Sequence, residues 1–177
     1  MLKVILVIFS FIIYSESKIY LNSVVTNRDL KRSNLSSVVF DDFFINTTFT
    51  VFSNFSKLLL TFTFSIPKDE RDKNYDFTLI HYTIQSCKIS QGSRANFIVK
   101  MLMDGNDFAQ IFKCPMLAGT YGFYNFKPND KFLPQVLLGK NRIRFQLLVK
   151  VDAKILNSKN ASVWLFTFKI QGEIKNS

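Results

Sequence analysis

Apolar and polar side chains alternate with a period of two along much of the chain. In segment 58–66 the even positions, from Leu58 to Ile66, are apolar, and Thr61, Thr63 and Ser65 lie between them. Such alternation is typical of a strand with one buried face. The same pattern predicts strands over 47–55, 80–85, 142–151 and 164–174, and shorter runs predict two more over 38–45 and 121–126.

These short amphipathic strands are not separated by regular helices, so they predict a mainly β protein, an antiparallel immunoglobulin-like β-sandwich. One segment departs from the pattern. Between Ala95 and Phe112 the apolar residues recur at intervals of three and four, which predicts one amphipathic helix, with a break at Gly105-Asn106. The length of 177 residues fits a single domain.

The first 17 residues are predicted to be a signal peptide. Lys3 precedes an apolar run from Val4 to Tyr14, and Ser15 and Ser17 have the spacing of a cleavage site. The run is too short to cross the roughly 30 Å of bilayer hydrocarbon as a helix. We therefore expect a secreted, extracellular domain over 18–177; the alternatives for this segment are an uncleaved anchor or a buried first strand.

Export changes how the cysteines and asparagines are interpreted. Cysteines pair in oxidising compartments, and Cys87 and Cys114 are the only two, so a single disulfide is predicted, with two buried free thiols as the alternative. The predicted helix lies between them.

Four Asn-x-Ser/Thr sequences predict N-linked glycans, on Asn34, Asn46, Asn54 and Asn160. The alternation over 47–55 places Asn46 and Asn54 together on a solvent-facing side.

Charge and composition exclude several classes of function. The net charge is +10, but Lys and Arg are scattered, so we expect no nucleic-acid partner and instead solubility or attraction to an anionic membrane surface. The single His81 lies on the polar side of a predicted strand, and no catalytic or metal-binding motif accompanies it. We expect no enzyme, cofactor or metal; a hydrolase that uses carboxylates alone is the remaining enzymatic alternative.

The surplus of phenylalanine suggests a binding site. Twenty Phe occur against one Trp, and many lie on the buried sides of predicted strands. Bulky rings on two facing sheets can line a hollow that holds an apolar ligand, although the same rings can equally form an ordinary packed core. The candidate cavity residues are Phe62, Phe64, Ile80, Tyr82, Phe145, Leu147, Phe166 and Phe168. Arg142, Arg144 or Lys169 is a candidate for a polar rim that meets an acidic head group, with ordinary surface charge as the equal alternative.

Short motifs follow one another in a characteristic order between positions 87 and 149. They are Cys87, Cys114-Pro115, Gly119-Thr120-Tyr121, Asn125-Phe126, Leu133-Pro134 and the basic and apolar segment 139–149. In this order the chain resembles a secreted insect family related to the ML (myeloid differentiation factor 2-related) lipid-recognition domain, which includes the ganglioside activator. It departs from the family pattern at Asn141, where a tyrosine is usual.

The resemblance implies an immunoglobulin-like sandwich whose two sheets splay apart to admit a lipid tail. It implies binding and presentation rather than chemistry, and insect relatives are linked to chemosensation and extracellular lipid handling. The first hypothesis is therefore a secreted carrier of a lipid or another hydrophobic small molecule. The alternative is an extracellular protein–protein adaptor or receptor ligand with a filled core.

Overall fold

The computed structural model describes residues 17–89, 114–128, 142–155 and 161–176. The described residues fold into eight strands and one short helix. In chain order these elements are β1 (Ser17–Arg28), β2 (Ser33–Phe40), β3 (Phe44–Val51), β4 (Phe55–Ile66), β5 (Phe77–Gln85), α2 (Ser86–Ile89), β6 (Gly119–Phe126), β7 (Arg142–Ile155) and β8 (Ser162–Asn176).

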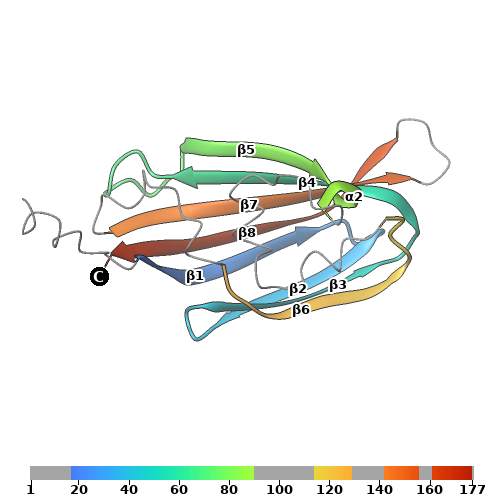
Figure 1. Cartoon of the computed structure of the whole chain (residues 1–177), viewed down its shortest axis with the longest axis horizontal. Coiled ribbons are helices and arrows are strands. Elements are labelled where there is room, and N and C mark those ends of the chain that lie inside the picture. The colour runs from blue at the N-terminus through green and yellow to red at the C-terminus, as the bar shows by residue number, and fades with distance from the viewer. Residues whose placement is uncertain (1–16, 90–113, 129–141, 156–160, 177) are drawn as a thin grey trace, which may run out of the picture.

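Two antiparallel sheets pack against each other, which confirms the predicted β-sandwich (Figure 1). The larger sheet has the order β1-β8-β7-β4-β5, and the smaller sheet has the order β2-β3-β6. Strands β1 and β2 lie next to each other where the two sheets meet (Figure 1). Long strands run nearly the whole length of the molecule, so the interior is a narrow layer between two apolar faces.

Alternating burial shows why these segments become strands. On β4, Leu58, Leu60, Phe62 and Phe64 are at most 1% exposed, while the threonines between them are only half-buried. Strand β7 alternates in the same way from Ile143 onward. Each fully buried large apolar side chain stabilises the fold by about 1.5–3 kcal/mol, so the inner faces supply the main driving force for folding.

Two predicted strand boundaries were wrong. The segment 38–45 is not one strand, because Asp41 and Asp42 have φ of 51° and 55° and form the tight turn between β2 and β3. The turn has three residues, 41–43, since Phe40 pairs with Phe44, and left-handed residues in such a short turn suit the twist of a hairpin. The segment 47–55 also fails as one strand, because the chain leaves the smaller sheet after Val51 and Phe55 begins β4.

Strand β1 was not predicted. Its alternation is interrupted where the pairing with β8 shifts between Leu21 and Ser23, so that Ile19, Leu21 and Val24 all contribute to the core despite their uneven spacing. The predicted helix over 95–112 and the apolar run of the predicted signal peptide lie outside the described residues. The predicted cleavage point after Ser17 coincides with the first residue of β1.

Cys87 of α2 forms a disulfide with Cys114, as predicted. The bond joins the end of β5 to the segment that leads into β6. Next to it, the backbones of Phe55 and Met116 exchange two hydrogen bonds of 2.8 and 2.9 Å. This end of the molecule therefore holds both sheets together. The described part of the chain contains no helix that could serve as a membrane span.

Gly172 occupies a crowded position of β8. A Cβ atom there would lie 2.2 Å from the carbonyl oxygen of Tyr20 and 2.8 Å from the ring of Phe145. The nearest of these atoms belongs to the backbone of β1, which is paired with β8 on both sides of a bulge at this level. Room for a Cβ atom would therefore require the strand itself to shift. We expect Gly172→Ala to lower the free energy of unfolding by about 3 kcal/mol, measured by urea denaturation. A loss below about 1 kcal/mol would show that β1 adapts.

Candidate functional site

The eight predicted cavity residues share the inner face of the larger sheet. Cross-strand pairing aligns Phe62 with Tyr82 and Phe64 with Ile80, and directly paired residues point to the same face. Six of the eight are at most 5% exposed, whereas Ile80 and Tyr82, on the edge strand β5, are half-buried. The sequence therefore placed these side chains correctly on one surface.

The opposing wall of this surface was not predicted. It comes from the smaller sheet, where Phe49 lies 5.2 Å from Phe166 and Phe123 lies 6.3 Å from Phe168, measured between ring centroids. Within the larger sheet Phe64 stacks on Phe145 at 5.5 Å. Rings from the two sheets thus interlock. No local sequence signal could identify these partners, because the contacts join distant parts of the chain.

Among the described residues, two small voids adjoin the inner face of the larger sheet. One of about 20 Å³ is lined by Val24, Ile45, Thr47, Phe123, Phe126, Val149, Phe168 and Ile170. The other, of about 10 Å³, is lined by Ile19, Leu21, Phe64, Pro128, Phe145, Leu147, Ile170 and Ile174. The two voids share Ile170, so they follow one another along β8. The polar member, Thr47, shares a 2.8 Å hydrogen bond with Ser37.

Their size decides what these voids hold in this conformation. Each has room for about one water molecule, whereas ligand pockets usually enclose about 300–1,000 Å³. A lipid tail therefore fits only if the sheets move apart or the rings change position. The hydrogen bonds along the β1–β2 side oppose such movement there: Leu21 N–H donates to the Asp42 carbonyl oxygen at 2.6 Å, and Ser33 Oγ donates to the Leu165 carbonyl oxygen at 2.8 Å.

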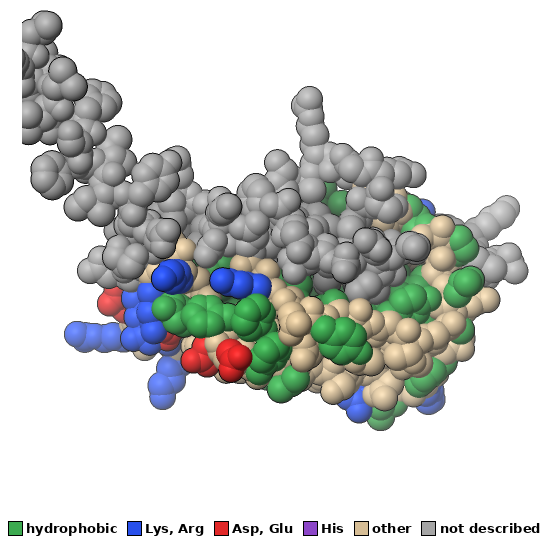
Figure 2. Space-filling model, turned by 60° about the horizontal axis from the view of Figure 1, so that its bottom comes forward, with side chains coloured by type: hydrophobic (Ala, Val, Ile, Leu, Met, Phe, Trp, Pro, Cys, Tyr) green, Lys and Arg blue, Asp and Glu red, His purple; other side chains and the backbone are tan. Residues whose placement is uncertain are grey.

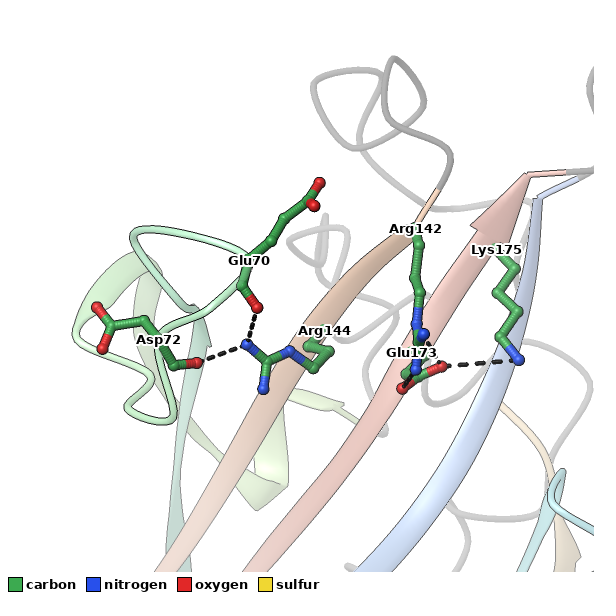
Figure 3. Close-up of polar contacts among 6 residues, drawn as sticks. All are labelled: Glu70, Asp72, Arg142, Arg144, Glu173 and Lys175. Atoms are coloured by element: carbon green, nitrogen blue, oxygen red, sulfur yellow. Dashed lines mark hydrogen bonds and ion pairs between the residues drawn. The ribbon is translucent and has the colours of Figure 1, made fainter.

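A larger pocket of about 350 Å³ opens at one end of the larger sheet. It is lined by Ile66, Pro67, Lys68, Asp69, Glu70, Arg142, Ile143 and Arg144. The guanidinium group of Arg144 donates hydrogen bonds to the backbone carbonyl oxygens of Glu70 and Asp72, each at 2.5 Å, and so fastens the turn after β4 onto β7 (Figure 3).

Beside this pocket, Arg142 forms an ion pair with Glu173 (Figure 3). Arg142 Nε donates to Glu173 Oε2 at 2.9 Å, and Lys175 Nζ lies 3.6 Å from the same oxygen. The hydrogen bonds from Arg142 hold the pKa of the Glu173 carboxyl below its ordinary value, although burial acts in the opposite direction. The same contact raises the pKa of Arg142.

The structure does not assemble the predicted basic rim. Arg142 and Arg144 lie together at the end of the sheet, but their guanidinium groups already bind Glu173 and the turn. Lys169 lies away from them on β8, where it pairs with Leu148 and Val25 in the middle of the sheet. These three side chains therefore do not form one site for an acidic head group.

His81 does not lie in a cleft. It is exposed on the outer face of β5, and its Nδ1 lies 3.0 Å from Thr63 Oγ1. Within the described ranges, His, Cys, Asp and Glu side chains form no group of three or more that could hold a metal ion.

Three of the four predicted glycosylation sites lie in the described residues. Asn34 on β2 is exposed and Asn46 on β3 is half-buried, and both belong to the smaller sheet. The alternation pattern predicted that Asn54 shares a strand face with Asn46, and this was wrong. Asn54 lies in the exposed loop before β4. The Oδ1 atoms of Asn46 and Asn54 accept backbone hydrogen bonds, which leaves Nδ2, the atom that carries a glycan, unaffected. Asn160 lies outside the described residues.

No protein-family model matches the chain, and no curated protein matches it.

The ion pair between Arg142 and Glu173 predicts a pH-dependent contribution to stability. The pKa of Glu173 is lower in the folded state than the ordinary value of 4.5. The pair therefore stabilises the fold above that pH, and the stabilisation is lost as the pH falls through the lowered pKa. We expect Glu173→Gln to lower the Tm at pH 7 by about 2–4 °C. The loss is small because the Arg142 side chain is largely exposed to solvent. Below pH 4.5 the Tm of the variant should approach that of the native chain, because Glu173 becomes protonated there.

Thermal unfolding between pH 3 and pH 8 measures this difference. Asp76→Gln is the matched control, because it removes one exposed carboxylate that is not among the groups acting on Arg142 or Glu173, and glutamine there creates no Asn-x-Ser/Thr sequence. A Tm difference for Glu173→Gln that is the same at every pH would contradict the assignment.

Proposed function

We propose that the protein is a secreted, non-enzymatic binding protein that takes up a lipid or another hydrophobic small molecule between its two sheets. The observation that carries this proposal is the pair of voids that share Ile170 and are lined almost entirely by apolar side chains, one between the two sheets and the other on the inner face of the larger sheet beside Pro128. Apolar space inside a protein stays dry and accepts apolar guests.

Uptake requires the sheets to separate at this seam. Between the hydrogen bonds of the β1–β2 side and the disulfide end, the sheets meet through rings such as Phe49 on Phe166. Separating rings exposes apolar surface, which costs about 25 cal/mol per Å². An apolar ligand that enters covers the exposed ring surface again and so offsets this cost. Water that entered the same space would leave the ring surface hydrated and would not offset it.

The order of motifs supports the same class of ligand. The resemblance to the ML lipid-recognition family rests in part on Cys87 and Cys114, which are bonded to each other, and on the residues that begin β6. It implies extracellular lipid handling or chemosensation in an insect. A disulfide also suits a protein that acts outside the cell.

A second candidate function is an extracellular adaptor or receptor ligand with a filled core. The small size of the voids, about 10 and 20 Å³, favours this candidate. In that case the eight inner residues serve stability alone, and recognition occurs on the outer surface.

Filling the junction of the two voids distinguishes these functions. We expect the secreted chain from insect cells to take up a fluorescent fatty acid, and Ile170→Phe to weaken uptake by about tenfold or more, because the added ring occupies the seam. Leu60→Phe is the matched control, since Leu60 on β4 is also buried and lines neither void. Both variants carry a similar overpacking cost of about 1–3 kcal/mol, which thermal melting verifies.

Two results would contradict lipid binding. The first is a native chain that neither takes up the probe nor carries an apolar molecule detectable by native mass spectrometry, which would favour the adaptor. The second is uptake by Ile170→Phe that equals that of the native chain or of Leu60→Phe, which would contradict binding at the two voids.

A further inference from the structure

The strands of the smaller sheet carry no charged side chain. Segments 33–40, 44–51 and 119–126, which form β2, β3 and β6, contain no Lys, Arg, His, Asp or Glu, although the net charge of the chain is +10. Figure 2 shows the side of the molecule on which this sheet lies. From the middle of the view rightwards the described surface is mostly uncharged, with Lys and Arg only at its margins. Mixed charges usually keep a protein surface in solution, so this face depends on uncharged polar groups instead.

Two of the predicted glycosylation sites lie on the outer face of this sheet. Asn34 on β2 and Asn46 on β3 occupy outward positions, where they pair with Thr50 and Val38. N-linked glycans are bulky and polar and are confined to protein surfaces. Sugars on these two residues would therefore cover the charge-free face.

An exposed aromatic ring lies beside the second of these sites. Tyr124 on β6 is 65% exposed, and its hydroxyl group shares a hydrogen bond of 3.3 Å with Thr48 Oγ1. Thr48 is the third residue of the sequon that begins at Asn46. Large aromatic side chains are rarely left this exposed on a strand without a contact to make. The ring and the sequon are therefore neighbours on adjacent strands.

Gly122 determines how the ring is placed. A Cβ atom on Gly122 would lie 2.9 Å from Tyr124 Oη and 3.1 Å from Tyr124 Cζ, so the ring lies over the backbone of its own strand. Gly122 also pairs with Thr48 across the sheet. A ring that lies along a sheet turns one flat, apolar face towards solvent. Tyr124 thus presents such a face beside the sequon.

The side chain of Asn46 is held next to this ring. Its Oδ1 accepts a hydrogen bond of 2.8 Å from the N–H of Asn125, the residue that directly follows Tyr124. Asn125 has a φ of 54°, and the pairing of β3 with β6 shifts at this level. Nδ2, the atom that carries a glycan, is bonded to the same carbon as Oδ1. A sugar attached to Asn46 therefore begins close to Tyr124.

We propose that the Tyr124 ring is the platform on which the first sugar of an N-linked glycan on Asn46 rests. One face of an N-acetylglucosamine ring consists of C–H groups, which pack on an aromatic face and shield it from water. The rest of the glycan then extends over the charge-free face. A sugar fits this ring better than a second protein, because a glycan on Asn46 stands between the ring and any partner.

This inference rests on secretion, which the proposed function includes, but not on ligand uptake between the sheets. Glycans are added only to chains that enter the secretory pathway. A chain that is glycosylated and takes up no lipid would contradict the proposed ligand and leave the platform intact.

The test compares variants of the full chain secreted by cultured cells that leave high-mannose glycans, after mass spectrometry has measured the occupancy of Asn46. We expect Tyr124→Thr to lower the Tm of the glycosylated chain by about 2–4 °C, but to lower that of Asn46→Gln by less than about 1 °C. Threonine suits a strand, so this change removes the ring without disturbing β6. Tyr124→Phe keeps the ring and should keep the native Tm.

Trimming with endoglycosidase H leaves one N-acetylglucosamine on each occupied asparagine. We expect the trimmed chain to retain the full effect of Tyr124→Thr, because only the first sugar contacts the ring. NMR provides a direct measure: the ring current of Tyr124 shifts the protons of the sugar on Asn46 upfield, and Tyr124→Thr abolishes this shift. Asn34→Gln is the matched control, since β3 separates its strand from β6, and the effect of Tyr124→Thr should be unchanged in it.

Three results would overturn the inference. An equal loss of Tm from Tyr124→Thr with and without the glycan on Asn46 would show that the ring packs only on protein. An occupied Asn46 whose first sugar shows no upfield shift would place that sugar away from the ring. An unoccupied Asn46 beside an occupied Asn34 would leave the platform without a ligand, whereas empty sequons throughout would contradict secretion as well.

Discussion

Apolar packing between the two sheets is the interaction on which the rest of the structure depends. Strand β8 lies at its centre: Phe166 contacts Phe49 of the smaller sheet, and Phe168 contacts Phe123. Neither sheet could stand alone, because each would expose an inner face of large apolar side chains to water. The register of β7, β8 and β1 is set by the need to present that face. Even the bulge in β1 serves this purpose, since it returns Val24 to the interior.

The same packing limits what the interior can hold. Interlocked rings gain many weak dispersion contacts, so a nearly filled seam is the more stable arrangement. A binding protein of this design must exchange contacts between rings for contacts with its ligand. Phenylalanine suits such an exchange, because a flat ring can turn about its side-chain bonds and cover either a neighbouring ring or a guest. The surplus of Phe is thus compatible with a closed ligand-free state and an expanded ligand-bound state.

Sequence alternation predicted the inner faces of β4 and β7 well, because most of each strand has one buried and one solvent-facing side. On β8 the alternation holds from Phe166 to Ile170 but fails before it, because Leu165 and Phe166 are both fully buried where the pairing with β7 shifts. The prediction failed where one extra residue or a turn shifts the alternation of buried and exposed side chains. The shift between Leu21 and Ser23 concealed β1, and the turn at Asp41 and Asp42 divided what the pattern showed as one strand.

Contacts between distant segments could not be predicted from the sequence. The ion pair of Arg142 with Glu173 depends on the register of β7 against β8, and the contact of Phe49 with Phe166 depends on how the two sheets stack. Each is set by tertiary packing rather than by any local signal. The predicted basic rim failed for this reason: nothing near Arg144 in the sequence shows that a distant turn occupies its guanidinium group.

The contacts around the seam bear on how a ligand would reach it. At one end, Arg144 fastens the turn after β4 and Arg142 is paired with Glu173, so an apolar guest would have to pass a layer of satisfied charges. Along the β1–β2 side, Leu21 N–H donates to the Asp42 carbonyl oxygen and Ser33 Oγ to the Leu165 carbonyl oxygen, so the sheets are joined there by hydrogen bonds as well as by apolar contacts. Separation of the sheets at either place therefore breaks polar contacts that an apolar guest cannot replace, whereas separation between the rings breaks only contacts that such a guest restores.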